Sequence, residues 1–182
     1  MAVRTPVISD RRRQLALWLL CAASLMIILD GTIVTVALPS IQRQLGFSAV
    51  SLSWVVNAYL IAFGSLLLLA GRLGDLIGRK RMFLAGLAAF TIASLLCGLS
   101  AGPAMLIAAR FAQGIGGAMA TAVSLGMIVT LFPGPREQAK AIGAFSFVGA
   151  AGASIGLVLG GVLTEAIGAF SFVGAAGASI GL

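Results

Sequence analysis

Long apolar runs alternate with short polar segments along this chain, and the alternation predicts its elements. A helix needs roughly 17–25 apolar residues to cross a hydrocarbon core of about 30 Å. The sequence has runs of this kind over residues 15–38, 52–70, 82–99, 103–132 and 141–163. We therefore expect an all-α polytopic membrane protein. Its first helix is expected to end at Pro39, followed by a short polar link over residues 40–51.

The most charged stretch, residues 71–81, separates the second and third apolar runs. It holds four basic residues and one acidic residue, so we expect a hinge at a membrane surface rather than in hydrocarbon. Residues 1–14 and 133–140 are also basic, whereas Arg43 alone lies in a turn predicted on the other side. Basic loops favour the cytoplasmic face, which predicts a multi-pass protein of the cell membrane with a cytoplasmic amino terminus. A tight turn that merely carries retention charges is the alternative interpretation of residues 71–81.

Composition narrows the function classes further. The 182 residues are 60% hydrophobic and 9% charged, with a mean hydropathy of +1.11, which excludes a soluble domain. A net charge of +7 can indicate nucleic-acid binding, but here the basic residues form short clusters between apolar runs, so no nucleic-acid partner is expected. The chain has no histidine, and its two cysteines lie in apolar runs, so we expect no metal site, no cofactor and no enzymatic activity.

Two apolar runs contain groups that are costly to bury in a membrane. Asp30 lies in the first run, and Arg110 and Gln113 lie in the fourth. Such residues usually face the bundle interior and mark a pathway. A rise of 1.5 Å per residue places Asp30 roughly 22 Å from the start of its helix and Arg110 roughly 10 Å from the opposite end, at similar depth. We therefore expect the two to pair, although Arg110 has an alternative role as a donor to backbone carbonyls.

Other positions in the apolar runs predict packing and interface contacts. Trp54 and Tyr59, near the start of the second run, suit an aromatic belt at the membrane interface. In the fifth run, Gly152, Gly156 and Gly160 form a small-residue stripe, with Gly161 beside it, that allows close helix contact. Plain helix packing explains this stripe whether or not the stripe also has a role in exchange.

Several of these segments are similar to one known family. The stretch GRLGDLIGRKR resembles the signature loop between helices two and three of the major facilitator superfamily, with key positions at Gly71, Asp75, Gly78, Arg79, Lys80 and Arg81. LDGTIVTVALP, at residues 29–39, resembles the signature of the fourteen-helix drug:proton antiporter branch. Residues 110–116 resemble its Arg-x-x-Gln-Gly-x-Gly segment. Residues 152–161 resemble its antiporter motif, with Ala153 and Leu157 at positions where that motif normally has proline.

The resemblance covers residues 15–165 and implies five helices of the amino-terminal half of a major facilitator bundle, truncated. It implies proton-coupled export of small hydrophobic or cationic compounds in the full-length relative. Asp30, Arg110 and Gln113 would then serve proton coupling and the substrate pathway, and Asp75 with Arg79 would gate the cytoplasmic side. The expected partners are the lipid bilayer, protons, a small-molecule substrate, and either the missing carboxyl-terminal half or a second copy. The alternative is a non-transporting truncated membrane fragment.

The end of the chain repeats an earlier segment without change. Residues 141–157 and 166–182 are the same seventeen residues, AIGAFSFVGAAGASIGL, at an offset of 25. Solenoid repeats are imperfect and need three or more copies, so a recent duplication or an artefact of sequence assembly explains the identity better. We expect residues 166–182 to be a duplicated apolar segment that replaces helix six.

Overall fold

A computed structural model of the chain describes residues 10–180 and shows an all-helical protein. Its elements are α1 (Asp10–Leu45), α2 (Ala49–Ile77), α3 (Arg79–Gly98), α4 (Pro103–Leu131) and α5 (Pro135–Ile180). Each of the five is long and apolar enough to cross a membrane. The predicted all-α polytopic fold is therefore confirmed. The expectations for residues 1–9 and 181–182 lie outside the described residues.

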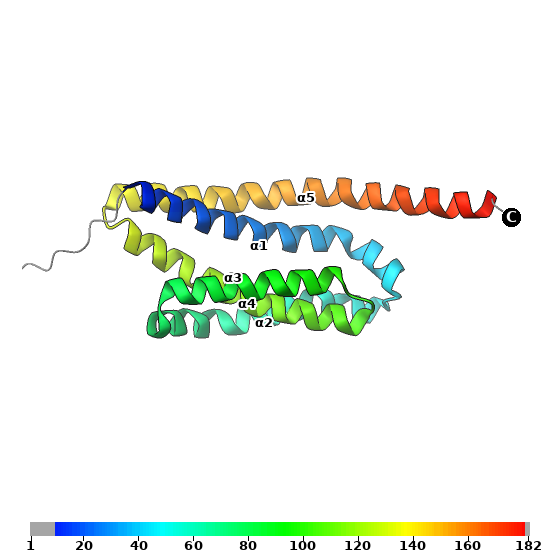
Figure 1. The fold of residues 1–182 in the computed structure, drawn as a ribbon, viewed down its shortest axis with the longest axis horizontal. Helices are drawn as coiled ribbons and strands as arrows, with labels where there is room; N and C mark the ends of the chain where they lie inside the picture. Colours follow the sequence, from blue (N-terminus) through cyan, green and yellow to red (C-terminus); the bar gives the residue numbers. More distant parts are fainter. Residues whose placement is uncertain (1–9, 181–182) are drawn as a thin grey trace, which may run out of the picture.

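The helices run alternately up and down and form two groups (Figure 1). α1 packs along α5, while α4 packs closely against both α2 and α3. α1, α3 and α5 begin at the same end of the bundle, on the left in Figure 1, where α2 and α4 terminate. We call this the basic end, because it carries a cluster of basic residues from four helices: Arg11, Arg12, Arg13, Arg72, Arg79, Lys80, Arg81, Arg136 and Lys140.

The charged stretch at residues 71–81 is a sharp helical corner instead of an extended hinge. α2 continues to Ile77 and α3 begins at Arg79, so only Gly78 lies outside a helix. Gly78 has a φ of 106°, which side-chain-bearing residues rarely adopt, and its N–H donates to the carbonyl of Gly74 at 3.1 Å. One glycine is therefore enough to reverse the chain. The expected loop at residues 133–140 is likewise mostly helix, because α5 begins at Pro135.

Our expectation that the first helix ends at Pro39 is wrong, since α1 continues to Leu45. Proline removes one backbone donor and bends a helix, and membrane helices tolerate this. The last turns are held by packing, because Leu38, Ile41 and Leu45 contact a small core of Phe47, Val55 and Leu106. This segment, cyan in Figure 1, angles toward α2, and the polar link expected at residues 40–51 shrinks to residues 46–48.

α5 passes through both copies of the repeated sequence without a turn. It spans 46 residues, or roughly 69 Å at 1.5 Å per residue, more than twice the thickness of a bilayer core. Its second half extends beyond the other helices, in orange and red in Figure 1. Between the copies the chain reads VLGGVLTE, residues 158–165, which contains no proline, and the helix continues through its two glycines. Up to Ile180, the duplicated segment is thus a continuation of α5 and does not fold back beside it.

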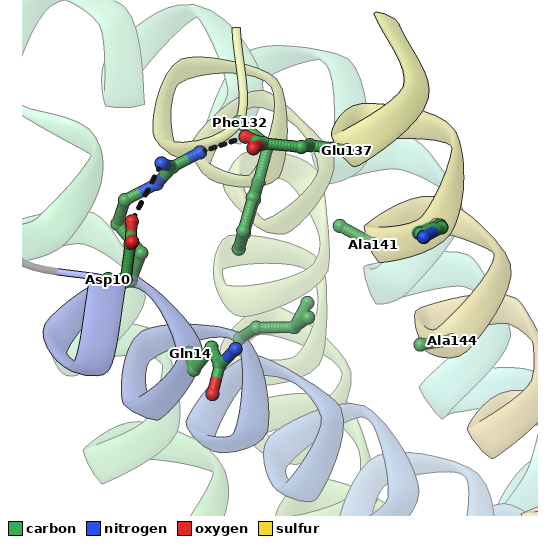
Figure 2. Close-up of a pocket in the computed structure, with 9 residues that line it drawn as sticks. Asp10, Gln14, Phe132, Glu137, Ala141 and Ala144 are labelled. Atoms are coloured by element: carbon green, nitrogen blue, oxygen red, sulfur yellow. Dashed lines mark hydrogen bonds and ion pairs between the residues drawn. The ribbon is translucent and has the colours of Figure 1, made fainter. Parts of the chain in front are cut away.

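A cavity of about 420 Å³ opens at the basic end, where α1 begins, α4 ends and α5 begins (Figure 2). Its lining combines charged and apolar side chains: Asp10, Arg13, Gln14, Leu17, Phe132, Glu137, Lys140, Ala141 and Ala144. Polar side chains of α1 and α5 therefore meet at this point, beside the end of α4.

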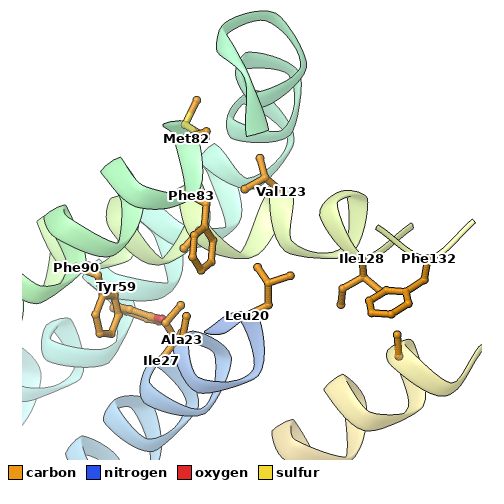
Figure 3. Close-up of a cluster of buried hydrophobic side chains, with 12 residues drawn as sticks. Leu20, Ala23, Ile27, Tyr59, Met82, Phe83, Phe90, Val123, Ile128 and Phe132 are labelled. Carbon is orange, nitrogen blue, oxygen red and sulfur yellow. The ribbon is translucent and has the colours of Figure 1, made fainter. Parts of the chain in front are cut away.

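The main apolar core joins the two helix groups (Figure 3). Leu20, Ala23 and Ile27 of α1 pack against buried residues of the other group, including Phe83 and Phe90 of α3. Positions 20, 23 and 27 are three and four residues apart and so lie on one helix face. This face turns Asp30, three residues after Ile27, toward α4.

Candidate functional site

Asp30, Arg110 and Gln113 form a closed hydrogen-bonded ring inside the bundle. Arg110 Nη1 donates to Asp30 Oδ2 at 2.6 Å and to Gln113 Oε1 at 2.6 Å. Gln113 Nε2 donates to the other Asp30 oxygen, Oδ1, at 2.7 Å. The structure thus brings together the three polar residues that the sequence marked in separate spans. Asp30 and Arg110 form the pair that their similar depth in the first and fourth apolar runs predicted.

Burying the charged groups of this ring away from water costs free energy. The side chain of Arg110 is 2% exposed and that of Asp30 is 17% exposed. Charges are tolerated away from water only when they are paired and hydrogen-bonded. Arg110 makes one further hydrogen bond, in which its Nε donates to the carbonyl of Val55 at 3.2 Å. Both roles considered for Arg110, ion pairing with Asp30 and donation to a backbone carbonyl, therefore occur together. Within the described residues, every buried side-chain nitrogen and oxygen has a partner.

Tyr59 belongs to the same site, contrary to the interfacial position expected for it. It is only 8% exposed, and its ring lies under the Arg110 guanidinium, 4.4 Å from carbon to ring centroid. A cation held over an aromatic face is stabilised by the ring quadrupole. Phe63, one turn along α2, stacks on Tyr59 at 5.7 Å between centroids. Tyr59 was misassigned because its position in the sequence, near a helix start, does not reveal which face of α2 meets α4.

Glycines of α4 allow α2 to approach this closely. A Cβ at Gly114 would lie 2.5 Å from the backbone oxygen of Tyr59, and one at Gly117 would lie 3.2 Å from its hydroxyl. Cys97 of α3 completes the surroundings, because its Sγ donates to Gln113 Oε1 at 3.6 Å. Sequence reasoning missed Cys97 as well as Tyr59. A cysteine in an apolar run gives no signal of its own, and only the packing of α3 on α4 brings it to the ring.

The ring contains one negative and one positive charge, on Asp30 and Arg110. Asp30 is its only carboxylate, so protonation there removes the negative charge that Arg110 and Gln113 bind. Arg110 keeps its positive charge in proteins. The charge of the Asp30 carboxylate therefore helps to hold α1 against α4. Among residues 10–180, no group of three or more His, Cys, Asp or Glu side chains is placed to hold a metal ion.

The charged corner between α2 and α3 forms a second polar cluster. Arg79 donates to Asp75 Oδ1 from Nε at 3.0 Å and from Nη2 at 2.9 Å, and its Nη1 donates to the carbonyl of Gly126 at 2.7 Å. Arg79 thus ties the corner to α4, one turn before that helix ends. A Cβ at Gly126 would lie 3.0 Å from the guanidinium, so this glycine leaves room for it.

The remaining residues of the corner have different positions. Lys80 and Arg81 are exposed, as is Gly78. Gly71 faces α4, where an added Cβ would lie 3.9 Å from Ala122. The structure therefore places only Asp75 and Arg79, of the six residues singled out there, in a hydrogen-bonded cluster.

The glycine stripe of α5 packs on α1. A Cβ at Gly152 would lie against Leu25, one at Gly156 against Thr32, and one at Gly160 would be 3.2 Å from Val36 Cβ. Gly161 has no atom within 4 Å of such a Cβ and takes no part in this contact. The stripe therefore works as a close helix contact, and α1, which carries Asp30, lies directly on it.

Comparison with known proteins agrees with this architecture. The sequence model of the Major Facilitator Superfamily matches residues 20–182. The puromycin resistance protein pur8 of Streptomyces alboniger is 47% identical over 156 residues, which cover 86% of this chain and 31% of that protein. The cephamycin export protein CmcT of Amycolatopsis lactamdurans is 47% identical over 150 residues, 82% of this chain and 31% of that protein. A probable actinorhodin transporter of Streptomyces coelicolor is 46% identical over 154 residues, 85% of this chain and 26% of that protein.

The chain spans about a third or less of the length of these relatives. The relatives are named as resistance, export and transport proteins, and the family match covers most of the five apolar helices. This chain is a multi-pass membrane protein and belongs to the major facilitator superfamily.

Proposed function

We propose that this chain forms the amino-terminal half of a proton-coupled exporter of small hydrophobic or cationic compounds. The observation that carries the proposal is the buried ring of Asp30, Arg110 and Gln113, which joins α1 to α4. Intramembrane charged groups generally mark ion or substrate pathways. The names of the relatives, among them export and multidrug resistance proteins, favour drug-like cargo.

In this proposal Asp30 is the proton-binding group and Arg110 its counter-ion. Deprotonated Asp30 holds α1 against α4 through Arg110 and Gln113. Protonation cancels one charge of the pair, so the attraction that couples the two helices weakens. Transporters of this class bind substrate and ion near the midplane and expose them alternately by rocking one half against the other. The proton at Asp30 would bias that equilibrium.

The charged corner is proposed to gate the cytoplasmic side. Asp75 and Arg79 form an exposed ion pair, and the third bond of Arg79 reaches the carbonyl of Gly126 on α4. The basic end would face the cytoplasm of a plasma membrane, because nine of its residues are basic against one, Arg43, near the opposite end. A membrane-impermeant thiol reagent should then label a cysteine at Gly102 from outside the cell only.

The coupling role is tested in a full-length relative that carries an aspartate at the position equivalent to Asp30. An Asp→Asn change there keeps the size and hydrogen-bonding capacity of the side chain but removes its titration. Substrate uptake into inverted vesicles should lose its dependence on an imposed proton gradient, while the amount of protein in the membrane stays the same. An Asp→Glu variant, which keeps a carboxyl, serves as the matched control and should retain part of the dependence. Unchanged proton-driven efflux in the Asn variant would refute the coupling role.

A further inference from the structure

Arg13 lies on the first turn of α1 and contacts both the end of α4 and the start of α5. Its Nε donates to the carbonyl of Leu131, at the end of α4, at 2.7 Å, and its Nη2 pairs with Glu137, on the first turn of α5, at 2.6 Å. Its guanidinium also lies 4.8 Å from the centre of the Phe132 ring. Figure 2 shows Asp10, Phe132 and Glu137 at the edge of the cavity of the basic end, with dashed lines for the two ion pairs that Arg13 makes.

Each of these partners suits a guanidinium. The carbonyl of Leu131 is one of the last carbonyls of α4, which have no partner within their own helix. Glu137 lies near the amino terminus of α5, where the helix dipole favours a carboxylate. The planar fork of arginine can serve both acceptors in fixed directions, which a lysine cannot do. Glu137 is 60% exposed, so its ion pair with Arg13 by itself contributes little to stability. The stabilisation comes from the several contacts that the one Arg13 side chain makes together.

The position of Arg13 matters because of the two-group architecture. The α1–α5 pair and the α2–α3–α4 group each pack tightly within themselves, and α1 and α5 make far fewer contacts with α4. Besides the apolar core, polar ties connect α1 to α4 at two levels. One is the Asp30 ring, and the other is Arg13, seventeen residues earlier, or roughly 25 Å along α1.

We infer that Arg13 holds α1, α4 and α5 together at the basic end, so that the two helix groups move as one body. Without Arg13, the α1–α5 pair is held to α4 by polar contacts only at the Asp30 ring, and the basic end of α1 can swing away. A rocking-type transporter needs each half to be stiff, since strain absorbed within one half is not transmitted to the other. This inference concerns the internal stiffness of the chain and does not depend on proton coupling.

The test measures distances in the chain of residues 1–182, reconstituted in lipid nanodiscs, by pulsed electron spin resonance. Cys21 and Cys97 are first replaced by Ala and Ser. Spin labels are then placed at Leu15 of α1 and Leu76 of α2, which are 56% and 72% exposed at the basic end. A second pair, at the exposed Gln44 and Leu99, reports on the opposite end of the same two helix groups.

Arg13→Ala should lengthen and broaden the Leu15–Leu76 distance distribution and leave the Gln44–Leu99 distribution unchanged. Arg12→Ala is the matched control, because it removes the same charge from an exposed neighbour on the same turn. Glu137→Gln keeps the bond to Leu131 and removes only the exposed ion pair, so it should give a smaller change. Arg13→Lys keeps the charge without the planar fork, so it should also lengthen the Leu15–Leu76 distance, and it decides the matter if Arg13→Ala folds poorly. The inference is overturned if the Arg13 and Glu137 variants match the wild type, or if Arg12→Ala has the same effect as Arg13→Ala. No substrate or proton gradient is present, so neither result bears on the proposed export.

Discussion

Arg110 combines in one side chain the contacts that a buried cation needs. A carboxylate, an amide oxygen, a backbone carbonyl and an aromatic face surround its guanidinium. Removing one member of such a set leaves the others buried without a partner, and this penalty exceeds the net contribution of the bond itself. The ring around Arg110 is therefore expected to behave as a unit.

This expectation is tested by a double-mutant cycle at Asp30 and Arg110. Asp30→Leu and Arg110→Leu should each lower the free energy of unfolding by about 3–5 kcal/mol, because each leaves an uncompensated buried charge. The double variant leaves none, so its loss should be clearly smaller than the sum of the single losses. The measurement is reversible unfolding in mixed detergent micelles. Additive losses would show that the two charges are not coupled.

At the scale of the elements, glycines decide how closely α4 approaches its neighbours. A Cβ at Gly86 of α3 would lie 2.7 Å from the backbone nitrogen of Ala120 and 2.8 Å from the backbone oxygen of Gly116. One at Gly116 would collide with the backbone of Phe90. Membrane helices gain no hydrophobic driving force from packing together, so van der Waals contact through such small residues has to hold them.

Alanine substitutions separate this packing role from ordinary helix propensity. Gly86→Ala should lower the free energy of unfolding by about 1–3 kcal/mol, because backbone atoms cannot move aside for the added methyl group. Gly64→Ala in α2 is the control, since a Cβ there meets no atom within 4 Å. That control should be neutral or stabilising by about 0.5–1 kcal/mol, as expected for an unhindered helix. Equal effects in the two variants would contradict the packing role of Gly86.

At the scale of the whole molecule, large apolar side chains cover much of the outer surface of the five helices. The exposed side chains of its helices are apolar over long stretches, for example Leu68 at 86% and Leu99 at 74%, which suits contact with lipid or with further helices. Alternating access in this superfamily moves one half against the other around a site between them. The matched residues cover 31% of pur8, which is less than one half of that protein.

We therefore expect residues 1–182 alone not to transport, which is the fragment alternative for this chain. The assay is proton-driven efflux of a fluorescent cationic dye from vesicles that contain only this chain, with a full-length exporter already shown to carry that dye as the positive control. Dye should leave the control vesicles and stay in the others. Proton-dependent efflux by this chain would overturn the expectation and point to two copies acting as the two halves.

The sequence alone determined the five spans, their alternation and the candidates Asp30, Arg110 and Gln113. These features depend on local properties: the lengths of the apolar runs, the basic clusters between them and the charged groups inside them. The sequence predicted the ends of the helices less well. Pro39 does not terminate α1, because packing of the turns that follow it outweighs the lost hydrogen bond.

Only the tertiary structure decided which faces meet. It brought Asp30 onto Arg110, moved Tyr59 from the expected interface into the site, and revealed Arg13 as a tie among three helix ends. In an all-round apolar helix no hydrophobic stripe marks the inner face, so rotation about the helix axis is set by contacts with neighbours that lie far away in sequence.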